Sequence, residues 1–286
     1  MARAGRIVAM RRAAIFAVLA CAALSAPAAD KPRVVALGGA LTEIVFALGR
    51  GEQLAGVDST STYPAEATRL PQAGYVRTLS AEGILSLKPA LILATSEAGP
   101  PTVLEQLRAS GVRIITVEEK HTLENVKEKI AAVGTALECP AEAASLLAQI
   151  ENDVAQLESR RAGMPEKPRA LFLMNHGALS AAGKDTAADA VLTLAGAVNC
   201  VTEYSRYKPL TAEAAVAASP DVIVTTTRTL QAAGGLDALL KTPGLALTPA
   251  GRNRRIVALD DLALLGFGPR TPKTILDLAE QLHRAK

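Results

Sequence analysis

The feature that most constrains the fold of this chain is a stretch that occurs twice. Residues 79–96 read LSAEGILSLKPALILATS, and residues 210–227 read LTAEAAVAASPDVIVTTT. The two align without a gap. Each predicts a short helix capped by Ser80 or Thr211, then a proline, then a strand of apolar and β-branched residues. Glu82 and Glu213 hold the same place in the first turn of these helices, where a carboxylate complements the helix dipole.

Two further pairs of segments extend the repeat. RVVAL from Arg33 resembles RALFL from Arg169, and RIITVE from Arg113 resembles RRIVALD from Arg254. Helix–proline–strand units also recur by chance in α/β proteins. Three pairs in the same order nevertheless favour two similar lobes with a cleft between them, and two copies are too few for a solenoid.

The remaining pattern alternates strands with helices, which predicts an α/β fold with central parallel sheets. The expected strands are 33–37, 54–58, 91–96, 113–117, 169–174, 221–227 and 254–259. Between the halves, residues 123–161 show only helical spacing, and Cys139-Pro140 divides them into two helices. The second helix, 141–162, is predicted to be a rigid spine joining the lobes; an ordinary surface helix is the alternative. Because the connection is helical, we expect little hinge motion between the lobes.

The first residues have the pattern of a secretory signal. Four arginines precede an apolar run over residues 13–24, which ends in the small residues Ala26-Pro27-Ala28. Cleavage there removes those arginines and no acidic residue, so the exported chain is nearly neutral instead of +3, which argues against nucleic acid as a partner. The run is too short to span a membrane. Cys21 fits a lipid-anchor site poorly, and both Met1 and Met10 are compatible starts.

The common catalytic motifs are missing: there is no G-x-S-x-G, P-loop, H-E-x-x-H or C-x-x-C, so we expect no enzyme. The histidines, at 121, 176 and 283, are too scattered to build a metal site by spacing. Gly38-Gly39 is more typical of a plain strand-to-helix turn than of an anion site. An oxidising compartment permits a disulfide between Cys139 and Cys200, but the sequence leaves their pairing open.

Ligands of open α/β sheets bind beyond the carboxyl ends of the strands. That rule selects Gly38-Gly39, residues 59–63, Ser96-Glu97, residues 175–177, Arg228 and Asp260-Asp261. Most loop tyrosines are half-buried packing residues. Tyr75 differs because Arg77 lies two residues away, on the same face of an extended segment. A guanidinium favours the phenolate form, and a phenolate is a known ligand of ferric haem.

Several segments of the chain resemble the periplasmic haem-binding proteins of bacterial ABC importers. These proteins belong to the helical-backbone class III of binding proteins, which also includes carriers of vitamin B12 and siderophores. The resemblance covers essentially the whole exported chain. Two of the segments that carry it, ALTEIVFALG (40–49) and LAGVDSTSTYP (54–64), are similar across the broad class, and MNHGALSAAGKDTAADAVLTLAG (174–196) carries it as well. The more specific part of the resemblance lies in GYVRTLSAEG (74–83) and GFGPRTP (266–272).

The resemblance implies two Rossmann-like lobes with central parallel sheets, joined by one long backbone helix. It implies haem b as the transported ligand, Tyr75 as the axial iron ligand, and Arg77 as its partner. His176 would be a second ligand position; a loop histidine bonded to backbone is the alternative. Glu82 and Glu213 would dock on permease subunits of the transporter; plain helix capping is the alternative.

Arg228, which follows a predicted strand, is expected to bind a haem propionate, because a guanidinium pairs bidentately with a carboxylate. We therefore predict a periplasmic, monomeric haem carrier that does not span the membrane. The predicted segments are a signal peptide at 1–28, an N-terminal lobe at 29–138, an inter-lobe helix at 139–163 and a C-terminal lobe at 164–286. The alternatives are a carrier of cobalamin or a ferric siderophore on the same fold, and a secreted hydrolase.

Overall fold

A four-stranded parallel sheet forms the centre of the first lobe. The computed structural model describes residues 32–164, 167–175 and 177–283, so the predicted signal peptide lies outside the described residues. The strand order is β2-β1-β3-β4, and every neighbouring pair is parallel. The strands are β1 (Val34–Leu37), β2 (Leu54–Val57), β3 (Leu91–Thr95) and β4 (Arg113–Val117). The helices between them are α2 (Gly39–Ala47), α3 (Ala81–Ser86) and α4 (Pro101–Ala109).

The second lobe contains a larger, mixed sheet, whose centre is parallel as expected and whose edge is antiparallel. The strands β10 (Ile256–Leu259), β9 (Val222–Thr226), β5 (Arg169–Asn175) and β7 (Val198–Asn199) pair in parallel. Two further strands, β6 (Leu179–Ala182) and β8 (Tyr207–Pro209), continue the sheet in antiparallel pairing. They are too short, at four and three residues, to leave a periodic pattern in the sequence.

Helices cover the second sheet, and four of them lie where the alternating sequence pattern predicts a helix, at 186–195, 211–218, 235–241 and about 270–284. The helices are α7 (Ala187–Leu194), α8 (Ala212–Ala218), α9 (Thr227–Ala232), α10 (Leu236–Leu240), α11 (Pro249–Arg252), α12 (Asp261–Leu265) and α13 (Thr271–Leu282). The sequence did not predict α9, α11 or α12. Each begins within two residues of a strand end or a proline turn and spans only four to six residues.

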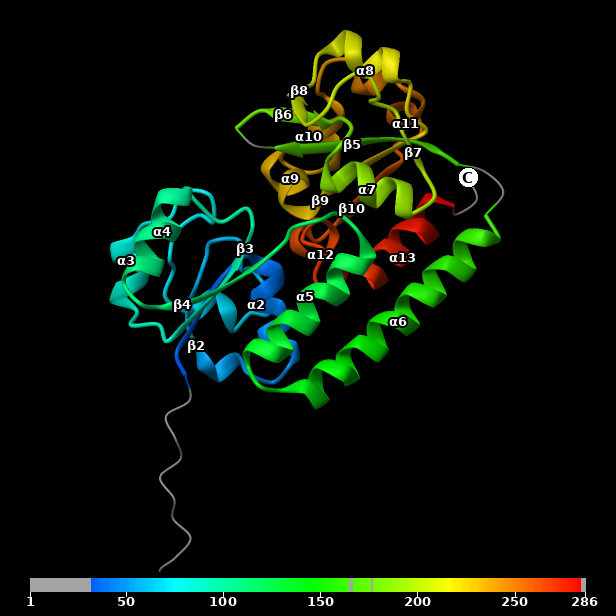
Figure 1. Cartoon of the computed structure of the whole chain (residues 1–286). Coiled ribbons are helices and arrows are strands. Elements are labelled where there is room, and N and C mark those ends of the chain that lie inside the picture. Colours follow the sequence, from blue (N-terminus) through cyan, green and yellow to red (C-terminus); the bar gives the residue numbers. More distant parts are fainter. Residues whose placement is uncertain (1–31, 165–166, 176, 284–286) are drawn as a thin grey trace, which may run out of the picture. The chain divides into compact units, whose positions relative to one another are not determined.

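A long helix connects the lobes, as predicted (Figure 1). α5 (Leu123–Ala136) ends before Cys139, and α6 (Pro140–Ala162) starts at the proline, where a missing N–H costs nothing. With 23 residues, α6 is about 35 Å long at 1.5 Å per residue. It packs against α5 of the first lobe and α13 of the second, burying Leu146, Ile150 and Leu157 in a core shared by both. From Arg33 onward the chain thus forms one compact unit.

The two copies of the repeat fold as expected. Ser80 caps α3 by accepting a hydrogen bond from the Gly83 amide, and Thr211 caps α8 by accepting one from Ala214. Both helices lead through a proline into buried strands, β3 and β9. Figure 1 shows α3 and α8 in different lobes, each on the side of its lobe remote from α6.

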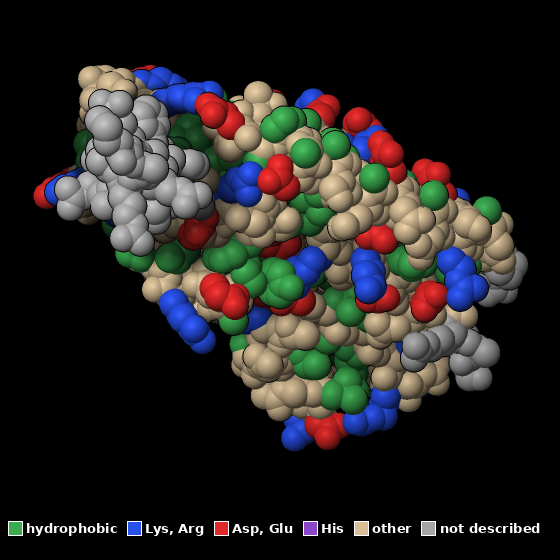
Figure 2. Space-filling model, turned by 90° about the horizontal axis from the view of Figure 1, so that it is seen from below, with side chains coloured by type: hydrophobic (Ala, Val, Ile, Leu, Met, Phe, Trp, Pro, Cys, Tyr) green, Lys and Arg blue, Asp and Glu red, His purple; other side chains and the backbone are tan. Residues whose placement is uncertain are grey.

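The surface charge, the helix lengths and the two cysteines relate to the predictions about partners, membrane spanning and a disulfide. On the face shown in Figure 2, basic and acidic side chains are interspersed, and no broad basic area is visible. Among the described residues, no helix combines the length and apolar character needed to cross a membrane.

Cys139 is buried and Cys200 is partly buried, and both are free thiols. Burial raises the pKa of the Cys200 thiol to about 11.

Candidate functional site

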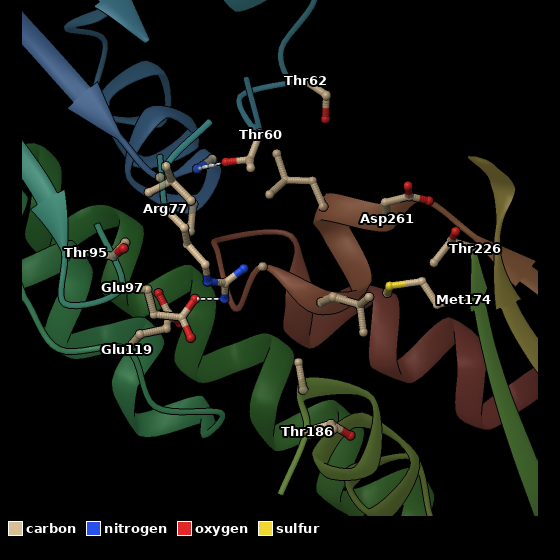
Figure 3. Close-up of a pocket in the computed structure, with 18 of the residues that line it drawn as sticks. Thr60, Thr62, Arg77, Thr95, Glu97, Glu119, Met174, Thr186, Thr226 and Asp261 are labelled. Carbon is tan, nitrogen blue, oxygen red and sulfur yellow. Dashed lines mark hydrogen bonds and ion pairs between the residues drawn. The ribbon is translucent and has the colours of Figure 1, made fainter. Parts of the chain in front are cut away.

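A cavity of about 950 Å³ lies where the carboxyl ends of both sheets meet. Such a volume is at the upper end of the range typical of small-molecule sites. Its walls come from the segments that follow the strands of both lobes, as the strand-end rule predicts (Figure 3). From the predicted segments these are Gly38, Gly39, Ser59, Thr60, Thr62, Glu97, Asn175, Arg228 and Asp261.

The glycine pair at the start of α2 is a structural turn. The buried carboxylate of Asp58 accepts the Gly38 amide at 2.9 Å, and the Thr60 hydroxyl accepts the Gly39 amide at 3.0 Å. Gly38 has a φ of +137°, and a Cβ there would lie 2.6 Å from Thr95. Because both amides already have internal acceptors, the turn is satisfied without a bound anion, in line with the interpretation of the sequence as a plain turn.

A tight turn presents Tyr75 to the cavity. The Thr78 amide donates to the Tyr75 carbonyl at 2.8 Å, so Tyr75 and Arg77 are the first and third residues of a β-turn and not part of an extended segment. Val76 between them is buried in the apolar core beneath. The turn is thereby anchored, while the Tyr75 side chain stays 42% exposed at the cavity wall.

Arg77 bridges Tyr75 and an acidic side chain. One guanidinium nitrogen donates to the Tyr75 hydroxyl at 2.7 Å, and the other pairs with Glu97. Burial works to lower the pKa of Arg77, but Tyr75 and Glu97 outweigh it, so the pKa is raised and the side chain stays cationic. The predicted contact between Tyr75 and Arg77 is therefore present, although through turn geometry. Its role in binding iron stays a prediction.

A buried ion pair forms part of the cavity floor. Lys129 of α5 is fully buried, and its ammonium pairs with Glu119, which lines the cavity. The same ammonium lies 3.4 Å and 3.3 Å from the carbonyls of Gly266 and Phe267 in the second lobe. Burial raises the pKa of Glu119 and lowers that of Lys129, while each charge opposes the shift of the other. The pair thus ties the two lobes together beneath the cavity.

His121 also lines the cavity, on the first lobe. Its ring packs against Phe267 with a centroid distance of 5.4 Å. Burial lowers the pKa of this histidine, which favours the neutral imidazole. Among the described residues, no group of three His, Cys, Asp or Glu side chains is arranged to hold a metal ion.

The wall from the second lobe carries two arginines. Arg228, in the first turn of α9, lines the cavity and pairs through Nε with Asp261 at 3.1 Å. Arg206, directly before β8, lines the cavity as well. The second predicted ligand position, His176, lies outside the described residues, so its role stays a prediction. The expected contact of Arg228 with a propionate also stays a prediction.

Tyr63, the other tyrosine of the first-lobe connections, has a different environment. Its ring lies under the guanidinium of Arg270, with 3.7 Å between that carbon and the ring centroid. Arg270 also pairs with the buried Glu43 and, at 3.1 Å, with Asp260, which forms a second polar contact between the lobes. Tyr63 is not part of the cavity lining.

Comparisons with known proteins agree with this architecture. Residues 34–263 match the family model described as periplasmic binding protein. The chain belongs to the periplasmic binding protein family. Its fold is similar to the periplasmic heme-binding protein BhuT, solved in complex with two hemes. The TM-score is 0.83 and the identity 46%, over 88% of this chain and 98% of that one.

Two curated relatives of this periplasmic binding protein are more distant. YvrC of Bacillus subtilis strain 168, an ABC transporter substrate-binding lipoprotein, is 27% identical over 89% of this chain and 81% of its own length. The vitamin B12-binding protein of Pectobacterium atrosepticum strain SCRI 1043 is 30% identical over 60% of this chain. That match covers 62% of the vitamin B12-binding protein.

Several cavity residues of this binding protein were missed by the sequence analysis. They are Glu119, His121, Met174, Asp185, Thr186, Arg206 and Tyr207. Glu119 and His121 follow β4, so the strand-end rule applied to all four strands of the first sheet would have found them. Asp185, Arg206 and Tyr207 lie around β6 and β8, the short strands that the sequence pattern does not reveal.

Proposed function

We propose that this protein is an exported, non-catalytic carrier that binds haem in the cavity and delivers it to an ABC importer. The observation that carries the proposal is the Tyr75–Arg77 contact at the cavity wall. A tyrosine oxygen is a known ligand of ferric haem, and the Arg77 guanidinium holds this oxygen at the cavity wall. The similarity to a heme-binding protein over nearly the whole chain supports the same conclusion.

The vitamin B12-binding relatives keep cobalamin as a second candidate. The side chains of a corrin end in uncharged amides, so an arginine-lined wall offers little to them. Haem instead presents two carboxylates and an iron that accepts an anionic oxygen. The cavity of this protein supplies arginines and a phenol, which favours haem. Titration of the purified protein with both ligands separates the two candidates.

Replacing Arg77 by alanine is expected to weaken tyrosinate coordination without abolishing it. The variant loses the guanidinium that contacts the Tyr75 hydroxyl at 2.7 Å, so the haem affinity and the intensity of the tyrosinate-to-iron absorption band should both fall. Arg77→Lys, which retains the charge, should lie between the two. Identical haem affinities and spectra of all three proteins would mean that Arg77 does not act on Tyr75.

The partner of the loaded protein is proposed to be a permease that receives one carboxylate from each lobe. Glu82 and Glu213 are exposed in the first turns of α3 and α8, and neither lines the cavity. Hydrogen bonds to the backbone and to Thr211 lower the pKa of Glu213, so it also serves in helix capping. Two equivalent carboxylates suit a partner with two-fold or pseudo-two-fold symmetry, whose basic pockets would fix orientation.

Removal of both carboxylates should therefore separate transport from binding. Glu82→Ala combined with Glu213→Ala is expected to leave haem affinity unchanged and to reduce haem uptake strongly in vesicles carrying the transporter. Glu105→Ala combined with Glu203→Ala provides a matched control, because it also removes one exposed carboxylate from each lobe. Normal uptake by the first double variant would refute the docking role and leave both residues as capping groups.

A further inference from the structure

The arginines that line the cavity differ in whether a carboxylate of the protein already pairs with them. Arg77 is engaged by Tyr75 and Glu97, and Arg228 is engaged by Asp261. Within the described part of the chain, no carboxylate lies within ion-pair distance of Arg206. The nearby Asp185 instead accepts a hydrogen bond from the Ser205 hydroxyl at 2.6 Å. Arg206 thus brings an uncompensated positive charge to the cavity wall.

The backbone at Arg206 is held in a conformation that an arginine rarely adopts. Its φ is +69°, in the left-handed region that favours glycine. Hydrogen bonds on both sides maintain this conformation. The Arg206 amide donates to the Lys184 carbonyl at 2.9 Å, and the Arg206 carbonyl accepts from the Gly183 amide at 2.8 Å. Directly after it, Tyr207 pairs with Ala182 in the sheet. A side chain held at a strained position beside a ligand cavity points to a functional role.

We propose that Arg206 binds a carboxylate of the cargo, which for haem is a propionate. This inference rests on the proposed function and extends it to the wall opposite Tyr75. Tyr75 belongs to the first lobe and Arg206 to the second, so a ligand that coordinates one and pairs with the other bridges the cleft. A guanidinium binds a carboxylate through two parallel hydrogen bonds, which fixes orientation as well as charge. Because Arg206 has no internal carboxylate partner, it engages the cargo without first breaking an ion pair.

The test compares haem with its dimethyl ester, which keeps the iron and the ring but has no carboxylate. Arg206→Gln is expected to lower the affinity for haem by about tenfold, as for loss of a charge-assisted hydrogen bond, and to leave the affinity for the ester unchanged. Raising the salt concentration should weaken haem binding by the wild type more than by the variant. Lys208→Gln is the matched control: Lys208 lies two residues along, stacks on Tyr204 and does not line the cavity.

A second variant keeps the test independent of folding. Arg206→Gly removes the same charge but relieves the left-handed backbone, so it should be at least as stable as the wild type while losing haem affinity to the same extent. Equal losses for haem and ester, or unchanged haem binding by Arg206→Gln, would overturn the inference while the wild type still binds haem. A wild type that binds neither ligand would overturn the proposed function itself.

Discussion

Replacing Tyr75 by phenylalanine is expected to abolish the tyrosinate-to-iron absorption band and to weaken haem binding by more than about 100-fold. Changes to groups that only orient a metal ligand already cost 10–100-fold in affinity, and loss of the ligand itself should exceed that. Phenylalanine keeps the ring and removes only the oxygen that Arg77 contacts at 2.7 Å. The variant therefore isolates the phenol from the shape of the turn.

Tyr63→Phe is the matched control for this experiment. Tyr63 and Tyr75 are similarly exposed, at 45% and 42%, and both lie in connections of the first lobe. Tyr63 is stacked beneath Arg270 and does not line the cavity, so its variant should keep the wild-type spectrum and affinity. A wild-type spectrum from Tyr75→Phe, with loss in Tyr63→Phe, would reverse the assignment.

Replacing Lys129 by methionine is expected to destabilise the apoprotein by about 3–5 kcal/mol. Removing one partner of a buried ion pair leaves the other charge without compensation in a low-dielectric environment. Lys129 is fully buried, its partner Glu119 is 13% exposed, and the ammonium also contacts two carbonyls of the other lobe. Urea unfolding at neutral pH measures the loss.

Two further variants test whether the loss of stability in Lys129→Met comes from the buried ion pair. Lys127→Met removes a lysine from the same helix, where Lys127 pairs with Glu124 at the surface, and should change the free energy of unfolding little. Lys129→Met combined with Glu119→Gln removes both charges and should recover much of the lost stability. If Lys129→Met unfolds at the same urea concentration as Lys127→Met, the ion pair does not hold the lobes together.

Much of this architecture could be predicted because it depends on local patterns. The repeat located α3, β3, α8 and β9, and Cys139-Pro140 located the break before α6. The strand-end rule placed Thr60, Glu97 and Arg228 at one cavity, because parallel strands bring their carboxyl ends to the same edge.

The missed features depend on contacts between distant segments. Lys129 occupies an ordinary position in a helical pattern, and its burial follows from packing against a loop more than 130 residues away. Arg206 lies beside β8, a three-residue strand whose pairing with β6 is set by the fold and not by hydrophobic alternation. The Tyr75–Arg77 contact was expected for the wrong local reason, since the segment is a turn.

The most direct test of haem as the cargo is a parallel titration of the purified apoprotein with ferric haem and with cyanocobalamin. The proposed function predicts saturable haem binding with a Soret band and a tyrosinate-to-iron band, and no binding of cyanocobalamin. The saturation point also gives the number of haems bound. Saturable binding of cyanocobalamin without any haem-dependent band would contradict the assignment of haem as the cargo.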